Sequence, residues 1–329
     1  MVGWGWENWI VLTRRMILLV GVCFVWHQAL AGGVSVTDWR GESIQATAGS
    51  VVSGGVKVVY HAAGEGPLLI FVHSITGPWF DFRHQFVTMA QTHTVVAMST
   101  RGTDESDKPV GYEHYATAKI TDDINAIIDH FEQDDAIIVG QGSGGLHAWH
   151  FAMTNPERTR GLISLGSPHP AALIRELAHN ESQRRASTFQ KWMQEDPQAG
   201  KQFGQNVRNR PADGTEPANL AALRKVAFER LDPESIVGFY KANWPVAPVT
   251  MDTEGFGFRF GSFPMVKAPA LFIYGRDNRV FVGGVLNDMW QWVDGELVTM
   301  ILPGAGHALH TQAPQIVTPA IARWINRLP

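Results

Sequence analysis

Short aliphatic runs alternate with helix-like patterns along most of this 329-residue chain. The candidate strands are residues 56–61, 68–73, 94–98, 136–140, 161–165, 271–274 and 297–302. Between them, residues 120–131 keep isoleucines at i, i+4, i+7 and i+8, as one buried helix face does, and residues 312–328 form a plausible closing helix. This alternation predicts βαβ units, and therefore an α/β fold with a mainly parallel sheet and helices on both faces. With 45% hydrophobic residues, the chain can bury a large core without disulfides or metals.

The alternation stops between residues 170 and 264, where no strong strand pattern appears. Polar helices are expected there, broken near Gly200 and Gly204, at residues 211–214 and at residues 245–248. The segment is predicted to be a helical lid, inserted after the sixth strand into a core made of residues 32–169 and 265–329. Such a lid would cover the carboxyl ends of the strands, where open α/β sheets bind ligands.

The first 31 residues have the pattern of an export signal. Thr13-Arg14-Arg15 precedes an apolar stretch over residues 16–26, and Ala29-Leu30-Ala31 offers a small-residue cleavage pattern. The apolar stretch is well short of the ~20 residues that a spanning helix needs, so no stable membrane anchor is expected. The chain is predicted to be exported, periplasmic or secreted, and the twin-arginine and general secretory routes both stay open.

Composition excludes several classes of function. The lone Cys23 lies inside the export signal, so a mature chain from Gly32 has no thiol for catalysis, cysteine-ligated zinc or disulfides. A formal net charge of −4 argues against a surface that neutralises nucleic-acid phosphates. The expected partner is a small apolar substrate or ligand, with the protein a monomer or a homodimer.

A glycine-rich turn marks the candidate site. The apolar run over residues 136–139 breaks into Gly140-Gln141-Gly142-Ser143-Gly144-Gly145, and a helical pattern follows over residues 146–153. A strand, a glycine-rich turn and a helix in this order are typical of a nucleophile mounted on a strained elbow.

Further motifs accompany this turn along the chain. They are Ala63-Gly64-Glu65-Gly66-Pro67, His73-Ser74-Ile75-Thr76-Gly77, Arg83-His84-Gln85, Arg101-Gly102, Ser106-Asp107-Lys108-Pro109, Ser167-Pro168-His169-Pro170, Phe239-Tyr240-Lys241-Ala242-Asn243 and Pro303-Gly304-Ala305-Gly306-His307. In this order and spacing, they make residues 56–327 resemble an α/β-hydrolase of the epoxide hydrolase and haloalkane dehalogenase group. The resemblance implies an elbow aspartate that forms an ester with substrate, a histidine that activates water, and two lid tyrosines that polarise the epoxide oxygen. It also places the oxyanion hole at the N–H groups of Ile75 and Ser143.

The chain departs from this pattern at the nucleophile. Aligned without gaps, the family's aspartate falls on Gly142, which has no side chain and can form no covalent intermediate. Ser143 becomes the nucleophile only in a shifted register, which puts Gln141 where a small residue must let the turn close. In the unshifted register, the Ser143 hydroxyl is expected to cap the following helix.

The other catalytic positions are only partly kept. The resemblance puts Asn278 at the position of the acid, where an amide cannot balance an imidazolium, and Asp277 could serve if the loop shifts. His307 matches the general base. In the lid, Tyr240 matches one polarising tyrosine and Trp192 falls at the expected position of the other, although both could simply fill the apolar underside of the lid.

Other chemistries leave weaker traces. Gly140, Gly142 and Gly145 satisfy the letters of a dinucleotide fingerprint, but the next strand ends without the acidic residue that would hold a ribose. The pairs His147 with His150 and His307 with His310 have no carboxylate pattern beside them. No cofactor and no metal are therefore expected.

Three functions stay open on this basis. The first is an epoxide-hydrolase-like hydrolase or lyase in which His307 acts directly as a base, with covalent catalysis disabled at Gly142 and Asn278. The second is an inactive, ligand-binding homologue with a degenerate triad. The third is a serine esterase acting through Ser143, His307 and Asp277.

Overall fold

A computed structural model describes residues 33–209 and 216–328. The predicted export signal, residues 1–31, and the predicted break at residues 211–214 both lie outside these residues. Among the described residues, no helix combines the length and the apolar character needed to cross a membrane.

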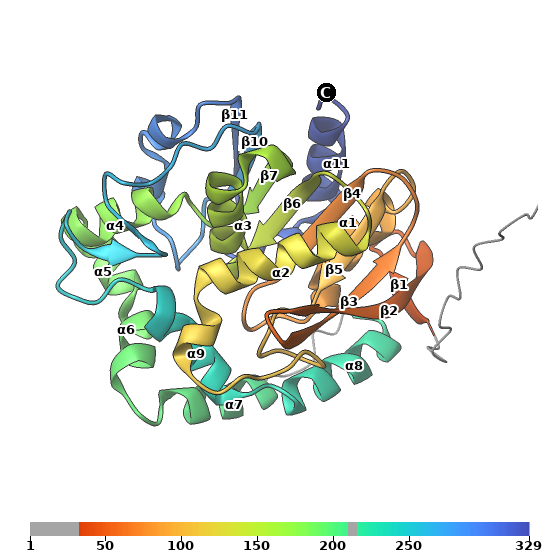
Figure 1. The fold of residues 1–329 in the computed structure, drawn as a ribbon, viewed down its shortest axis with the longest axis horizontal. Coiled ribbons are helices and arrows are strands. Elements are labelled where there is room, and N and C mark those ends of the chain that lie inside the picture. The colour runs from red at the N-terminus through yellow and green to blue at the C-terminus, as the bar shows by residue number, and fades with distance from the viewer. Residues whose placement is uncertain (1–32, 210–215, 329) are drawn as a thin grey trace, which may run out of the picture. The chain divides into compact units, whose positions relative to one another are not determined.

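The centre of the fold is a nine-stranded sheet in the order β1-β2-β3-β5-β4-β6-β7-β10-β11 (Figure 1). Pairs along β1-β2-β3-β5 are antiparallel, and those from β5 through β4 to β11 are parallel. The strands are β1 (Val34–Thr37), β2 (Ser43–Ser53), β3 (Val56–Ala63), β4 (Leu68–Val72), β5 (Thr94–Met98), β6 (Ala136–Gln141), β7 (Thr159–Leu165), β10 (Ala270–Gly275) and β11 (Leu297–Leu302), with a separate hairpin of β8 (Glu254–Gly255) and β9 (Phe258–Arg259). The predicted parallel α/β sheet is confirmed.

Helices cover both faces of this sheet (Figure 1). The α-helices are α1 (Arg83–Met89), α2 (Thr117–His130), α3 (Ser143–Thr154), α4 (Pro170–His179), α5 (Glu181–Ala186), α6 (Thr188–Glu195), α7 (Ala199–Arg208), α8 (Ala218–Glu229), α9 (Pro233–Asn243), α10 (Leu309–Gln312) and α11 (Pro314–Ile325). Short 3-10 turns are η1 (Trp79–Phe82), η2 (Tyr112–Tyr115), η3 (Pro156–Arg158), η4 (Gly283–Leu286) and η5 (Met289–Trp292).

Alternate residues of the central strands supply two separate cores. In β4, Leu68, Ile70 and Val72 pack in a cluster with α2 and α3, whereas Leu69 and Phe71 pack in a cluster with α1 and α11. Because strand side chains point alternately to the two faces, a continuous apolar run is buried on both. The isoleucines of α2 at 120, 124, 127 and 128 are all buried, as their spacing predicts.

The insertion, residues 170–264, contributes α4 to α9 and the short β8–β9 hairpin between β7 and β10. It begins after β7, which is the strand predicted at residues 161–165; this strand is the seventh in chain order and not the sixth. The predicted break near Gly200 and Gly204 is wrong, because α7 runs through both glycines. A Cβ on Gly200 would lie 2.7 Å from the carbonyl oxygen of Pro233, so this glycine permits a close approach of α7 to α9.

One residue of α9 ties the insertion to the core. Asn243 Oδ1 accepts hydrogen bonds from the Thr117 N–H at 2.6 Å and from the Thr117 hydroxyl at 2.8 Å. Its Nδ2 donates to the carbonyl oxygen of Tyr115 at 2.8 Å. Since Thr117 is the first residue of α2, the amide of Asn243 satisfies a helix N-terminus that has no side-chain cap of its own.

Candidate active site

The elbow between β6 and α3 has the backbone of a strained turn. Gly142, between the two elements, has φ 60° and ψ −127°, a conformation that L-residues adopt only at a cost. A Cβ built at this position would lie 3.3 Å from His307 Nε2. The apex of the elbow therefore faces the imidazole, and the residue at that apex is Gly142.

Neighbouring glycines let this turn close. A Cβ on Gly140 would lie 2.1 Å from the carbonyl oxygen of Gly144, and one on Gly144 would lie 1.9 Å from that of Val72. Real Cβ atoms do not come this close to backbone oxygens, so β6, α3 and β4 pack at distances that only glycine allows.

Ser143, the first residue of α3, is hydrogen-bonded to the turn after β4. Its Oγ accepts a 2.7 Å hydrogen bond from the N–H of Ile75, in the turn after β4. The expectation that this hydroxyl caps α3 is wrong, because its oxygen accepts from Ile75 in the turn after β4 and not from an N–H of α3. The consequence is that the Ile75 N–H, one of the two expected oxyanion donors, already has a partner.

Ser74 occupies the space that a nucleophile would need. A Cβ at Gly142 would lie 2.6 Å from Ser74 Oγ and 2.8 Å from Ser74 Cβ. The predictions from sequence did not single out this residue. The signal was present, since Ser74 is the residue directly after His73 in the motif where the related family has glycine.

His307, in the loop after β11, is partly buried. Burial lowers the pKa of its imidazole to about 4, so the ring is neutral at pH 7. Its Nδ1 is buried and has no hydrogen-bond partner among the described residues. The backbone is held by Gln141, whose Nε2 donates to the His307 carbonyl oxygen at 3.1 Å, and the ring lies 5.6 Å from that of Phe281.

Asn278 is buried beside this loop, but its amide is committed to backbone groups. Oδ1 accepts from the N–H groups of Val280 at 2.9 Å and Phe281 at 3.2 Å, and Nδ2 donates to the carbonyl oxygen of Gly166 at 2.9 Å. Among the described residues, the amide makes no hydrogen bond to His307. A Cβ at Gly166 would be 3.6 Å from both Asn278 Nδ2 and His307 Nδ1, so the two side chains are nevertheless neighbours.

Asp277 does not reach the site. Its side chain is 57% exposed, and its nearest charged partner is Arg276, with Nε and Oδ1 3.6 Å apart. The loop shift that would have made Asp277 the acid of a triad is absent from the conformation described here.

An aromatic wall extends from His307 into the insertion. Trp244 stacks on Phe281 with ring centroids 6.4 Å apart, and Tyr240 lies 6.1 Å from Trp244. Burial raises the pKa of the Tyr240 phenol above its ordinary value, so it stays a neutral hydrogen-bond donor. Among residues 33–209 and 216–328, the phenol makes no hydrogen bond.

The residue facing Tyr240 is Phe189 rather than Trp192. Phe189 packs edge-on against Tyr240 with centroids 5.7 Å apart. Trp192 lies 5.9 Å from Phe189, and its indole N–H donates to Asp196 Oδ2 at 2.9 Å, one turn along α6. The indole that sequence reasoning placed beside the substrate is therefore already hydrogen-bonded, and Tyr240 faces a ring without a donor.

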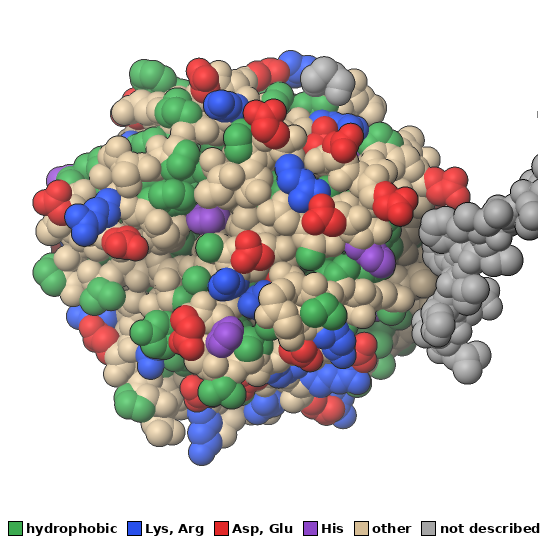
Figure 2. Space-filling view, in the orientation of Figure 1, with side chains coloured by type: hydrophobic (Ala, Val, Ile, Leu, Met, Phe, Trp, Pro, Cys, Tyr) green, Lys and Arg blue, Asp and Glu red, His purple; other side chains and the backbone are tan. Residues whose placement is uncertain are grey.

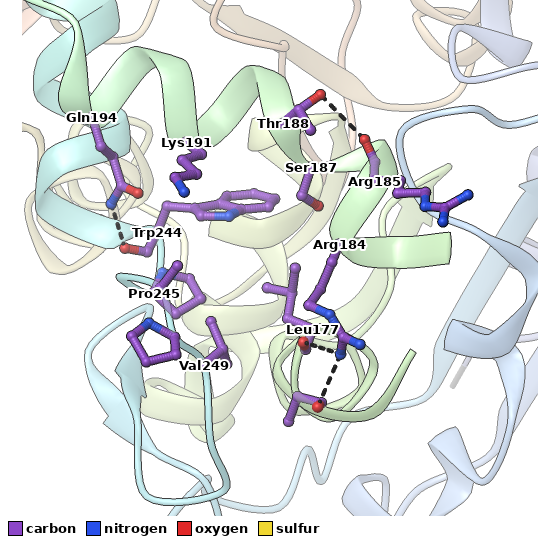
Figure 3. A pocket seen from close by; sticks show the side chains of 13 residues that line it. Leu177, Arg184, Arg185, Ser187, Thr188, Lys191, Gln194, Trp244, Pro245 and Val249 are labelled. Carbon is purple, nitrogen blue, oxygen red and sulfur yellow. Dashed lines mark hydrogen bonds between the residues drawn. The ribbon is translucent and has the colours of Figure 1, made fainter. Parts of the chain in front are cut away.

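A cavity of about 540 Å³ opens within the insertion (Figure 3). Leu177, Trp244, Pro245 and Val249 give it an apolar lining, and Lys191 stands at its side. None of the lining residues belongs to the elbow or to the His307 loop. Trp244 connects the two regions, because it lines this cavity and also stacks on Phe281.

The described residues contain no group of three or more His, Asp or Glu side chains placed to hold a metal ion. His150 Nδ1 is hydrogen-bonded to the Thr121 hydroxyl at 2.9 Å, whereas Nδ1 of His147 is buried without a partner. The absence of a metal and of a cofactor stays a prediction.

Figure 2 shows basic and acidic side chains interspersed over the face in view.

Comparisons with known proteins agree with this fold. The family described as alpha/beta hydrolase fold matches residues 67–314. Epoxide hydrolase 3 of Xenopus tropicalis is 24% identical over 282 residues, which are 83% of this chain and 75% of that protein. The AB hydrolase superfamily protein YfhM of Bacillus subtilis is 35% identical over 123 residues, which are 36% of this chain and less than half, 43%, of that relative.

Solved structures show the same architecture. An epoxide hydrolase from Bacillus megaterium in complex with an inhibitor superposes with a TM-score of 0.77 at 24% identity, over 85% of this chain and 100% of that one. The epoxide hydrolase VrEH1 from Vigna radiata gives 0.71 at 18% identity, over 86% of this chain and 98% of that one. The chain is therefore similar to epoxide hydrolases in sequence and in structure, and it belongs to the α/β-hydrolase fold family.

Proposed function

We propose that this protein is a hydrolase of small apolar substrates in which His307 acts directly as the general base, with no covalent intermediate at position 142. The observation that carries the proposal is the 3.3 Å approach of His307 Nε2 to the missing Cβ of Gly142. This approach supports a base at the position of His307, although Gly142 has no side chain to serve as a nucleophile. A positioned base contributes about 10²–10⁴-fold to a rate.

Tyr240 supports an epoxide or a related strained substrate. Its buried phenol stays protonated and can donate to an oxygen that gains charge as a ring opens. Phe189 opposite it has no donor, so a single phenol would carry this task. Such a site is expected to be slower than one with two donors.

The test is a comparison of the purified protein with His307→Ala on a panel of epoxides, haloacids and esters. Turnover that disappears in the variant supports the proposal, with His179→Ala, an exposed histidine at the end of α4, as the matched control. Turnover that persists at an equal level in His307→Ala contradicts it.

A second candidate function is a ligand-binding homologue without turnover. It is favoured by the committed amide of Asn278, the unpartnered Nδ1 of His307 and the occupied Ile75 N–H, which together remove the charge balance and one oxyanion donor. Retained binding of an epoxide or ester in calorimetry, with equal background hydrolysis in His307→Ala, would favour this candidate.

A third candidate, ester hydrolysis through Ser143, is the least favoured. The Ser143 hydroxyl accepts from Ile75, and Asp277 is exposed beside Arg276. An active-site serine reagent is therefore expected to leave Ser143 unlabelled.

Restoring the nucleophile tests the register of the elbow. Gly142→Asp alone meets the 2.6 Å contact with Ser74 Oγ, so the informative variant is the pair Gly142→Asp with Ser74→Gly. Epoxide opening through an ester on residue 142, trapped and seen by mass spectrometry, is the expected gain. An ester on residue 143 or nowhere would contradict the register.

The export signal and the assembly state belong to the same proposal. The protein is taken to be exported, periplasmic or secreted, with a mature chain from Gly32 that acts as a monomer or homodimer on a small apolar ligand. N-terminal sequencing of the exported chain and light scattering test these two points.

A further inference from the structure

Ser74 and Gly142 form a matched pair across the site. The serine side chain fills the volume in front of the elbow, and a Cβ at 142 would come within 2.6 Å of its Oγ, closer than real Cβ contacts. Side chains at both positions are therefore incompatible without movement. The turn after β4 therefore places a hydroxyl in front of position 142, where Gly142 has no side chain.

The backbone that presents Ser74 is firmly held. The Ser74 carbonyl oxygen accepts from the Gly77 N–H at 2.8 Å and from His73 Nδ1 at 2.6 Å. His73 is anchored in turn, since its Nε2 accepts from the Thr100 N–H at 3.1 Å. Burial lowers the pKa of His73, so it remains neutral and keeps one donor and one acceptor for these two bonds.

The Ser74 hydroxyl lies near the imidazole of His307. Among the described residues it makes no hydrogen bond, and the side chain is partly exposed. A Cβ built on Gly142 would lie 2.6 Å from Ser74 Oγ and 3.3 Å from His307 Nε2. Both atoms therefore border the same small volume. They are not hydrogen-bonded in this conformation, but a χ1 rotation moves Oγ without moving the backbone.

We propose that Ser74 is the nucleophile of this protein and that its substrates are carboxylic esters with small apolar acyl groups. The proposal rests on the proposed function, in which His307 is the base. The Ser74 Oγ attacks the ester carbonyl carbon while its proton passes to His307 Nε2. The tetrahedral intermediate then collapses, the C–O bond to the leaving alcohol breaks, and that alcohol takes the proton from His307.

The type of substrate decides whether the covalent adduct on Ser74 can be hydrolysed. An acyl-serine is hydrolysed when water, deprotonated by His307, attacks its carbonyl and releases the acid and the serine. Attack of Ser74 on an epoxide would instead leave an alkyl ether, which has no carbonyl for water to attack. Ser74 therefore selects esters, whereas epoxides would have to react with water directly.

Turnover is expected to be slow. Asn278 makes no hydrogen bond to His307 and carries no charge, and the comparable replacement in a serine-protease triad lowers turnover about 10⁴-fold. Stoichiometric labelling by a reactive acyl-like reagent is therefore a better readout than turnover alone.

The decisive experiment uses a fluorophosphonate probe on the purified chain, followed by tryptic mapping. Cleavage after Lys57 and Arg83 gives a peptide of residues 58–83 with Ser74 as its only serine, and cleavage after Lys119 and Arg158 gives residues 120–158 with Ser143 as its only serine. We expect one adduct per chain, located in residues 58–83. An adduct in residues 120–158, an adduct elsewhere, or none at all overturns the proposal.

Variants separate a nucleophile from a bystander. Ser74→Ala is expected to abolish the adduct, whereas Ser50→Ala, an exposed serine of β2, leaves it unchanged. His307→Ala is expected to slow labelling about 10²-fold or more. Ser74→Cys, which keeps a nucleophile, is expected to restore labelling with a thiol-reactive acylating probe, and failure of that rescue in a folded variant counts against the proposal.

Ester hydrolysis distinguishes this inference from the proposed function. Hydrolysis that needs His307 but persists in Ser74→Ala leaves the proposed function standing and refutes Ser74 as nucleophile. An adduct on Ser74 without any hydrolysis that depends on His307 refutes the proposed function and leaves the nucleophile standing.

Discussion

Ser143 Oγ accepts a 2.7 Å hydrogen bond from the N–H of Ile75, 68 positions earlier in the chain. The bond joins the first residue of α3 to the turn after β4 and so fixes the two walls of the site against each other. It also makes the N–H of Ile75, which was predicted to be an oxyanion donor, unavailable to a ligand unless the Ser143 side chain rotates.

Ser143→Ala is expected to lower the free energy of unfolding by about 0.5–1.5 kcal/mol, the usual net value of a hydrogen bond. Urea unfolding followed by tryptophan fluorescence measures it. Ser50→Ala, at an exposed position of β2, is the control. Equal midpoints for the two variants would mean that the bond contributes nothing.

Asn278→Asp is expected to raise the pKa of His307 from about 4 by about 1–3 units, because a carboxylate close to the ring favours imidazolium. Since the base must be neutral, the rate is lost as pH falls through this pKa. The acid limb therefore moves from near pH 4 toward neutral pH. NMR titration of the imidazole and a pH–rate profile check this, with the exposed Asp277→Asn as control, and an unmoved pKa contradicts it.

Acid should destabilise the fold well above pH 4. Burial lowers the pKa of His61, His150 and His307 to about 4 and of His84, His147, His169 and His310 to about 3. In the unfolded chain each titrates near 6.5, so the unfolded state binds more protons as pH falls below that value. Each histidine then contributes a slope of about 1.4 kcal/mol per pH unit, and stability present above pH 6.5 is lost below it.

Urea midpoints at pH 7.5, 6.5 and 5.5 measure this loss, which is expected to begin near pH 6.5. His310→Gln should reduce the slope, because one titrating group is removed. A midpoint that stays constant down to pH 5 would show that these histidines are protonated within the fold.

Asp123→Asn is expected to cost about 3–5 kcal/mol, because it leaves the Arg101 guanidinium buried without its charge partner. Arg101 Nε donates to Asp123 Oδ2 at 2.8 Å, and both side chains are almost fully buried. Asp129→Asn breaks the ion pair with Arg158. Because the Asp129 side chain is 68% exposed, this change should cost less than about 1 kcal/mol. Calorimetric unfolding compares the two, and similar losses would contradict the distinction.

Strand positions in the core could be predicted because buried parallel strands are continuous aliphatic runs. The β1 and β2 strands were missed for the opposite reason. Most of the eleven residues of β2 are exposed or partly exposed, and Ser, Thr, Ala and Gly dominate its sequence. Such a strand is held by its pairing with β3, which no local pattern records.

The candidate site likewise has features that the sequence predicted and features that it did not. The strand, the glycines and the helix pattern over residues 136–153 were enough to locate the elbow, and the family resemblance then placed Gly142 at its apex. The direction of the Ser143 hydroxyl, the position of Ser74 and the pairing of Phe189 with Tyr240 depend on contacts between segments far apart in the chain. Those contacts are set by packing of the insertion and of β4 against α3, which spacing alone does not specify.

The contact between positions 74 and 142 also limits how such a sequence can change. A lineage that acquires a side chain at 142 while Ser74 is present meets a steric clash, whereas one that first reduces position 74 to glycine does not. The two sites are therefore epistatic, and the order of substitutions matters. A library for directed evolution of this scaffold should vary both positions together. Saturation of position 142 alone produces only variants whose new side chain clashes with Ser74.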